Sequence, residues 1–157
     1  MSGTLPAAEV IEIRNAIALF AHVFDNDLVD DMGLVFSEDM VVESVLGQGY
    51  SIPGLEAGKD FLRRRRPETA DHHTVDTVLF WDDAEHVSAR SRYLAVRADG
   101  GINSGDYFDI LVKTPEGWRI QYRLSVPRTP DGPRAPVDAS FLANWRPSAA
   151  RLPLRIA

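Results

Sequence analysis

Residues 102–126, INSGDYFDILVKTPEGWRIQYRLSV, decide the fold class of this chain. Two long runs rich in β-branched and aromatic residues, Ile102–Thr114 and Gly117–Val126, are separated by the turn signal Pro115-Glu116-Gly117. Such a short connection predicts a hairpin, and therefore two antiparallel strands. Strands of about a dozen residues are longer than usual and must twist and bend, which favours a sheet curled around a cavity.

The same strand pattern continues upstream of this hairpin. Thr74–Trp81 and His86–Arg97 are predicted as two further strands, and the turn signals Asp82-Asp83 and Asp99-Gly100-Gly101 follow them. Four strands joined by short turns predict an antiparallel meander.

The N-terminal part has a helical pattern instead. Glu9–Phe24 carries one apolar stripe at three- and four-residue steps, which predicts an amphipathic helix. A shorter helix is expected over Val29–Val35, a strand over Met40–Leu46, and a third helix over Leu55–Arg66. The glycines and the proline at 47, 49, 53 and 54 predict a loop between that strand and the third helix. Helices first and strands afterwards predict a segregated α+β fold, with a curved antiparallel sheet packed on N-terminal helices around a pocket.

We expect one domain over residues 1–126 and an extension over residues 127–157. The extension holds six of the ten prolines. A short helix is predicted at Asp138–Trp145, with Phe141, Leu142 and Trp145 as anchors. We expect this extension to pack on the body of the domain or on a neighbouring subunit.

Composition excludes several kinds of function. A net charge of −6 argues against a nucleic-acid partner, which requires a basic surface. The chain has no cysteine, so disulfides and thiolate chemistry are absent. The four histidines lack metal-ligand spacing, and no glycine-rich phosphate loop follows a strand, so we expect no metal and no cofactor. No apolar run is long enough to cross a membrane, and a cytoplasmic location is expected.

What remains is acid–base chemistry, which needs a carboxylate, an imidazole and a pocket. Asp25 ends the first predicted helix, and Arg123 lies on the polar face of the last predicted strand, although both patterns are also typical of surface residues. His72 and His73 open the meander, and only one of them can face a pocket because strand side chains alternate. Alternation favours His73, which shares the more apolar face of the strand with Val75, Thr77, Leu79 and Trp81.

Several short motifs occur in a characteristic order between Glu9 and Val126. They are the helix end FAHVFD at 20–25, FSED at 36–39, GLEAGKDFL at 54–62, His72 with Asp76 four residues later, GDYFD at 105–109 and GWRI at 117–120. In this order they resemble the SnoaL-like branch of the NTF2-like superfamily, whose members include scytalone dehydratase and hexachlorocyclohexane dehydrochlorinase. The resemblance implies a cone-shaped barrel, in which helices close a curved sheet over a pocket.

The resemblance also implies a chemistry and its residues. In the dehydratase and dehydrochlorinase members a helix Asp and a strand His form an acid–base dyad, which corresponds here to Asp25 and His72. The spacing to Asp76 selects His72 over His73, against the alternation argument. Arg123 corresponds to an arginine near the leaving group. We expect Phe20, Phe24, His73 and Tyr107 to contact a substrate.

The implied protein is a cofactor-free lyase, isomerase or polyketide-cyclase-like enzyme that acts on a small apolar molecule and forms a dimer or trimer. Three positions depart from scytalone dehydratase: Phe24 replaces a helix tyrosine, the region of Glu43 and Ser44 lacks a strand tyrosine, and Arg97 lies near a second histidine position. Scytalone is therefore not the expected substrate. Two alternatives stay open: a non-catalytic ligand-binding or accessory protein, and an interaction module that lacks a cavity of ~300 Å³.

Overall fold

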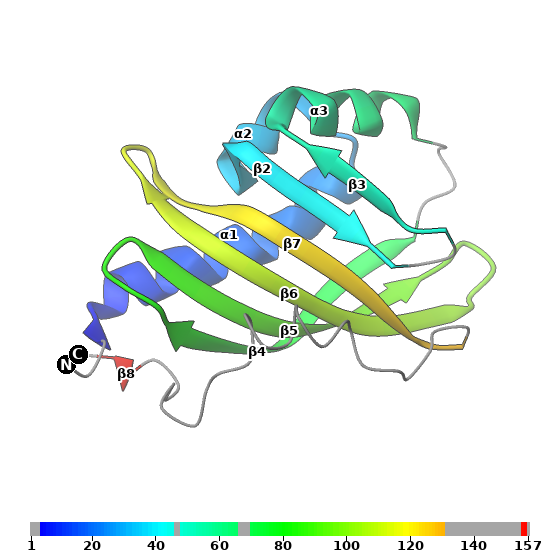
Figure 1. Ribbon diagram of the computed structural model, residues 1–157. Helices are drawn as coiled ribbons and strands as arrows, with labels where there is room; N and C mark the ends of the chain where they lie inside the picture. Colours follow the sequence, from blue (N-terminus) through cyan, green and yellow to red (C-terminus); the bar gives the residue numbers. More distant parts are fainter. Residues whose placement is uncertain (1–3, 46–47, 66–69, 131–154, 157) are drawn as a thin grey trace.

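The computed structural model describes residues 4–45, 48–65, 70–130 and 155–156, the last two through the backbone alone. The fold is α+β, as predicted (Figure 1). Its N-terminal half contains β1 (Thr4–Leu5), α1 (Ala7–Asp25), η1 (Val29–Asp31), α2 (Met32–Val35), β2 (Phe36–Ser44), β3 (Tyr50–Pro53) and α3 (Leu55–Arg64). The meander follows as β4 (Asp71–Trp81), β5 (His86–Val96), β6 (Ile102–Thr114) and β7 (Gly117–Thr129), and β8 (Arg155–Ile156) is the last described element.

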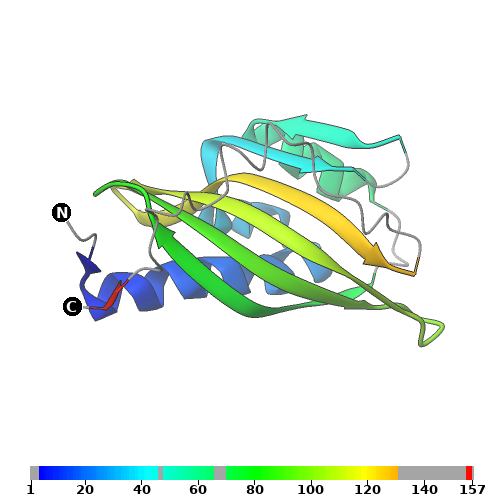
Figure 2. The ribbon, with the colours of Figure 1, turned by 60° about the horizontal axis from the view of Figure 1, so that its bottom comes forward.

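The main sheet has six strands in the order β3-β2-β7-β6-β5-β4. Its strands are long, curved and strongly twisted (Figure 2). All neighbouring pairs are antiparallel except β2 and β7, which run parallel. The sheet is therefore mixed rather than wholly antiparallel, and it is open rather than closed into a barrel, because β3 and β4 remain at its edges. The predicted meander corresponds to the β4–β7 part.

Helix α1 packs its apolar stripe against the sheet. Val10, Ile13, Ile17 and Phe20 are buried, as their spacing predicts. At its first turn, Glu9 accepts hydrogen bonds from the Trp118 indole and the Lys113 ammonium, which tie the helix to the β6–β7 hairpin. Within the described residues, no helix is long and apolar enough to cross a membrane.

The structure differs from the predicted elements in several places, and two strands begin earlier than predicted, β2 at Phe36 and β4 at Asp71. The second predicted helix is divided into the 3-10 helix η1 and the single-turn helix α2. Strand β3 occupies the segment for which glycine and proline predicted a loop. The two glycines with positive φ, Gly49 and Gly54, lie on either side of the strand. Strand β7 continues to Thr129, three residues past the predicted domain boundary. The helix predicted at 138–145 lies outside the described residues.

Two β-bulges change which side chains face the helices. The register of β4 with β5 shifts between Val75 and Val78, and Asp76 there has a φ of 53°. The register of β6 with β7 shifts where Ile110 pairs with Tyr122 and Leu111 with Ile120, which leaves one extra residue in β7. An extra residue moves the following side chains to the other face of the strand.

Gly105 on β6 lies where the sheet is too closely packed for a side chain. A β-carbon at position 105 would collide with the Tyr93 ring and with the backbone carbonyl of Val126. We expect Gly105→Ala to lower the free energy of unfolding by about 1–3 kcal/mol, because the backbone carbonyl cannot move aside cheaply. Urea denaturation measures this loss. Gly33→Ala is the matched control, since its β-carbon would meet only Leu55 at 3.8 Å, and an equal loss in both variants would contradict the prediction.

Candidate active site

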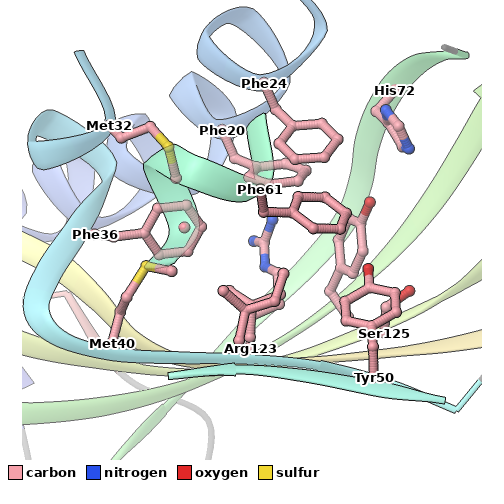
Figure 3. A pocket seen from close by; sticks show the side chains of 14 residues that line it. Phe20, Phe24, Met32, Phe36, Met40, Tyr50, Phe61, His72, Arg123 and Ser125 are labelled. Carbon is pink, nitrogen blue, oxygen red and sulfur yellow. The ribbon is translucent and has the colours of Figure 1, made fainter. Parts of the chain in front are cut away.

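A pocket lies on the concave side of the sheet, between α1, α3 and the strands β2, β3 and β7 (Figure 3). Its volume is about 80 Å³, which is smaller than the ~300–1,000 Å³ of common ligand sites. The residues that line it are Phe20, Phe24, Met32, Phe36, Met40, Val42, Tyr50, Ile52, Gly58, Phe61, His72, Tyr107, Arg123 and Ser125.

Asp25 and His72 are in direct contact at one end of this pocket. Helix α1 ends at Asp25, and the Asn26 side chain hydrogen-bonds the free carbonyl of His22 at 2.8 Å. The Asp25 carboxylate accepts two hydrogen bonds from His72. One comes from the backbone N–H at 2.6 Å, and the other joins Oδ1 to the ring Nδ1 at 2.7 Å. The side chains are 11% and 19% exposed, so the pair is mostly shielded from water.

This contact determines how the imidazole is oriented. An ionised carboxylate only accepts hydrogen bonds, so the short contact places a proton on Nδ1 of His72. In the neutral ring, Nε2 then carries a lone pair. No described residue hydrogen-bonds Nε2, and the ring points into the pocket (Figure 3). The arrangement is suited to a general base that is oriented by a carboxylate.

His73 lies on the other side of β4 and is exposed, so the structure does not bring it to the pocket. The alternation argument for His73 assumes an unbroken strand, and the bulge at Asp76 breaks it. His72 pairs with Ala95 and Leu79 pairs with Ala89, and both alanines are buried on the same face of β5. His72 therefore shares its face with Leu79, although the two are an odd number of positions apart in the sequence.

Arg123 lies in the wall of the pocket, where it forms a wholly buried ion pair. Its Nε and Nη2 donate to the two carboxylate oxygens of Asp109 at 2.7 and 2.8 Å. The side chains are 1% and 0% exposed. Burial by itself would lower the pKa of Arg123, but the attraction and hydrogen bonds of Asp109 outweigh it, and the net shift is upward. The arginine is therefore a permanent cation.

Two aromatic rings enclose this guanidinium. Its central carbon lies 4.4 Å from the Phe20 ring centre and 4.2 Å from that of Tyr107, and Tyr107 stacks on Tyr93 at 4.6 Å. Cations are attracted to aromatic faces, most strongly where water is excluded. Nη1 of Arg123 is buried and has no hydrogen-bond partner among the described residues. It is the group through which the cation can bind a ligand atom.

The phenols of the pocket stay protonated at neutral pH. Burial raises the pKa of Tyr107 well above its ordinary range, although the Arg123 cation acts in the opposite direction. Burial also raises the pKa of Tyr50, which hydrogen-bonds Ser44, and of Tyr93, which hydrogen-bonds Ser125. Of these residues, Tyr50 and Tyr107 line the pocket, so their protonated phenols can donate hydrogen bonds to a ligand.

Phe24 forms part of an aromatic stack at the pocket mouth. It stacks on Phe20 at 5.1 Å and on Phe61 at 6.4 Å, and Phe61 stacks on Tyr50 at 5.7 Å. Phe61 and Tyr50 are 36% and 44% exposed, whereas Phe20 is buried. The two exposed rings therefore separate the cavity from solvent, and a ligand larger than a few atoms requires them to move.

The structure brings together Asp25, His72, Arg123, Phe20, Phe24 and Tyr107 of the predicted site residues. The sequence interpretation missed Tyr50, Ser125 and Phe61. Tyr50 lies in a segment that predicted a loop, so its sequence carries no signal for a pocket position. Ser125 and Arg123 share the predicted polar face of β7, and that pattern could have indicated a cavity wall. No cluster of potential metal ligands occurs among the residues described.

Several solved structures have an architecture similar to that of this chain. No curated protein matches the chain. A candidate scytalone dehydratase from Novosphingobium aromaticivorans has a TM-score of 0.68 and 19% identity, over 83% of this chain and 91% of its own. A protein of unknown function from Mycobacterium tuberculosis has a TM-score of 0.65 and 24% identity, over 87% and 91%.

The β subunit of a candidate aromatic-ring-hydroxylating dioxygenase, also from N. aromaticivorans, has a TM-score of 0.62 and 18% identity, over 78% of this chain and 92% of its own. At these identities the similarity establishes the fold and not the reaction. The family model of the SnoaL-like domain matches residues 7–124, the segment that contains the helices, the meander and the Asp25–His72 pair. The chain therefore belongs to the SnoaL-like domain family.

Proposed function

We propose that this protein is a cofactor-free acid–base enzyme, a lyase, isomerase or cyclase, that acts on a small apolar molecule. One observation carries the proposal: the Asp25 carboxylate accepts hydrogen bonds from both the backbone N–H and the ring Nδ1 of His72. This double contact fixes the position of the imidazole at the pocket and leaves Nε2 as a base.

In the proposed reaction, Nε2 of His72 takes a proton from a carbon beside an activating group. The C–H bond breaks and an N–H bond forms. The electron pair moves to a neighbouring carbonyl oxygen, giving an enolate, or expels a leaving group from the next carbon. Asp25 stabilises the imidazolium that forms, as a carboxylate does for a catalytic histidine in other enzymes.

Arg123 is placed to stabilise the negative charge that develops on the substrate. Its Nη1 is the donor that Asp109 leaves unused, and the buried phenol of Tyr107 lies beside it. Donors held rigidly in a site that excludes water stabilise a developing anion more than water does. In this proposal Phe20 and Phe24 contribute apolar contacts, and the exposed His73 takes no part.

The small volume of the cavity favours a second candidate function. A pocket of about 80 Å³ holds very little in its present form. In the second function the chain is a non-catalytic binding or accessory protein, and the Asp25–His72 pair only joins α1 to β4. Oligomerisation as a dimer or trimer and a cytoplasmic location remain predictions under either function, and light scattering measures the mass of the particle.

His72→Ala separates the two functions. 1-Tetralone is a small bicyclic ketone with one activated CH₂ group, and its hydrogen–deuterium exchange in D₂O is followed by proton NMR. We expect the wild-type protein to accelerate this exchange and His72→Ala to lose about 10²–10⁴-fold of the acceleration, because the base is removed. His73→Ala is the matched control and keeps the wild-type rate. Equal rates for the wild type and His72→Ala would contradict the enzymatic proposal.

Asp25→Asn tests whether the carboxylate orients the base. The amide has nearly the same size but removes the negative charge, and its NH₂ group can donate to Nδ1 and shift the ring proton to Nε2. We expect the exchange rate to fall by about 10²-fold or more while ketone binding remains.

Nitrogen-15 NMR of the His72 ring reports the proton position directly, on Nδ1 in the wild type and on Nε2 in Asp25→Asn. Asp27→Asn serves as the control, since Asp27 pairs with Arg65 at 3.0 Å and does not contact His72. An Asp25→Asn protein with full exchange activity would exclude the orienting role.

A further inference from the structure

The pocket has a polar end and an apolar end. His72, Tyr50 and Ser125 lie at one end, and Met32 and Met40 lie at the other together with Phe36 (Figure 3). The guanidinium of Arg123 lies between them (Figure 3). A substrate that reaches the base and the cation with its polar group therefore directs its apolar body toward the two methionines.

Helix α3 contacts this apolar end at Gly58. A β-carbon at Gly58 would collide with the terminal methyl group of Met40 and would lie 3.1 Å from that of Met32. Both methionines are almost wholly buried, at 1% and 3% exposure. Helix interiors disfavour glycine, so its presence inside α3 is explained here by the space that the two thioether ends occupy.

The atoms at this end can adapt to what they contact. Methionine is unbranched and flexible, and it fills irregular spaces in apolar surroundings. The tips of Met32 and Met40 lie against the backbone of α3 at Gly58, and all three residues line the cavity. A methyl group added at position 58 displaces the Met40 tip, and the cavity of about 80 Å³ is the open space beside it.

We propose that Met32 and Met40, with Gly58 against their tips, form the subsite for the apolar body of the substrate, and that Gly58 determines how large this body can be. The chemical class is a carbonyl compound with its activated carbon at the polar end and its apolar group at the other. The assignment rests on the proposed function, because that function places the polar group of the substrate near His72 and Arg123.

Methionine-methyl NMR tests this subsite directly, because the chain has only three methionines. Met32→Leu and Met40→Leu assign the two pocket signals, and Met1 is the internal reference. We expect 1-tetralone to shift the signals of Met32 and Met40, whereas cyclohexanone, with a single ring, shifts them less. In Gly58→Ala the Kd for 1-tetralone should rise by about tenfold or more, and that for cyclohexanone by less than about twofold.

A second substitution identifies the route of this effect. Gly58→Ala acts through the tip of Met40, so adding Met40→Val, which removes the tip and suits a strand, should restore 1-tetralone binding. Gly33→Ala is the matched control and leaves both Kd values unchanged. Alanine favours helices more than glycine does, so α3 persists in the variant, and thermal melting verifies this.

Three results would overturn the subsite: 1-tetralone binding without any shift of the Met32 and Met40 signals, equal loss of both ketones in Gly58→Ala, or no binding of either ketone to the wild-type protein at millimolar concentration. A different result would contradict the proposed function without contradicting the subsite. Methionine shifts without His72-dependent deuterium exchange leave the subsite intact and exclude the base.

Discussion

The buried ion pair between Asp109 and Arg123 is the constraint on which the pocket depends. Two charges removed from water are tolerated only with near-ideal geometry, and here two parallel hydrogen bonds of 2.7 and 2.8 Å join them. Asp109 belongs to β6 and Arg123 to β7, so the pair holds two adjacent strands in register at the pocket wall. Because Phe20 and Tyr107 enclose the guanidinium, the pair also determines where helix α1 lies over the sheet.

The Asp25–His72 contact depends on this placement of α1. Phe20 contacts Arg123 and lies one turn and a half before Asp25, so the position of the helix over the sheet also sets that of its C-terminal carboxylate. Strand β4 lies at the edge of the sheet, and it brings His72 to that carboxylate. A charged pair in the wall and an acid–base pair at the mouth are thus connected through one helix. Under the proposed function, this connection holds the base in the fixed position that proton transfer from carbon requires.

The apolar end of the pocket, at Met32 and Met40, has more flexible side chains than the polar end. The thioether groups of Met32 and Met40 line it, and their flexible side chains can adjust more easily than the strands below them. A rigid polar end beside an adaptable apolar end is consistent with one kind of reaction on molecules of different size. Under the proposed function, this adaptable end is where the cavity of about 80 Å³ would enlarge to hold a substrate.

The sequence by itself determined the first and third helices, the meander strands and the acidic end of the first helix, because helical stripes and hairpin turns are local patterns. The spacing of His72 to Asp76 in the family resemblance also selected His72 over His73. The tertiary structure decided what depends on distant contacts: the parallel pairing of β2 with β7, the position of Tyr50 in the pocket, and the partner of Arg123. Alternation along β4 failed because the bulge at Asp76 reverses the faces, and such a bulge is set by pairing with β5.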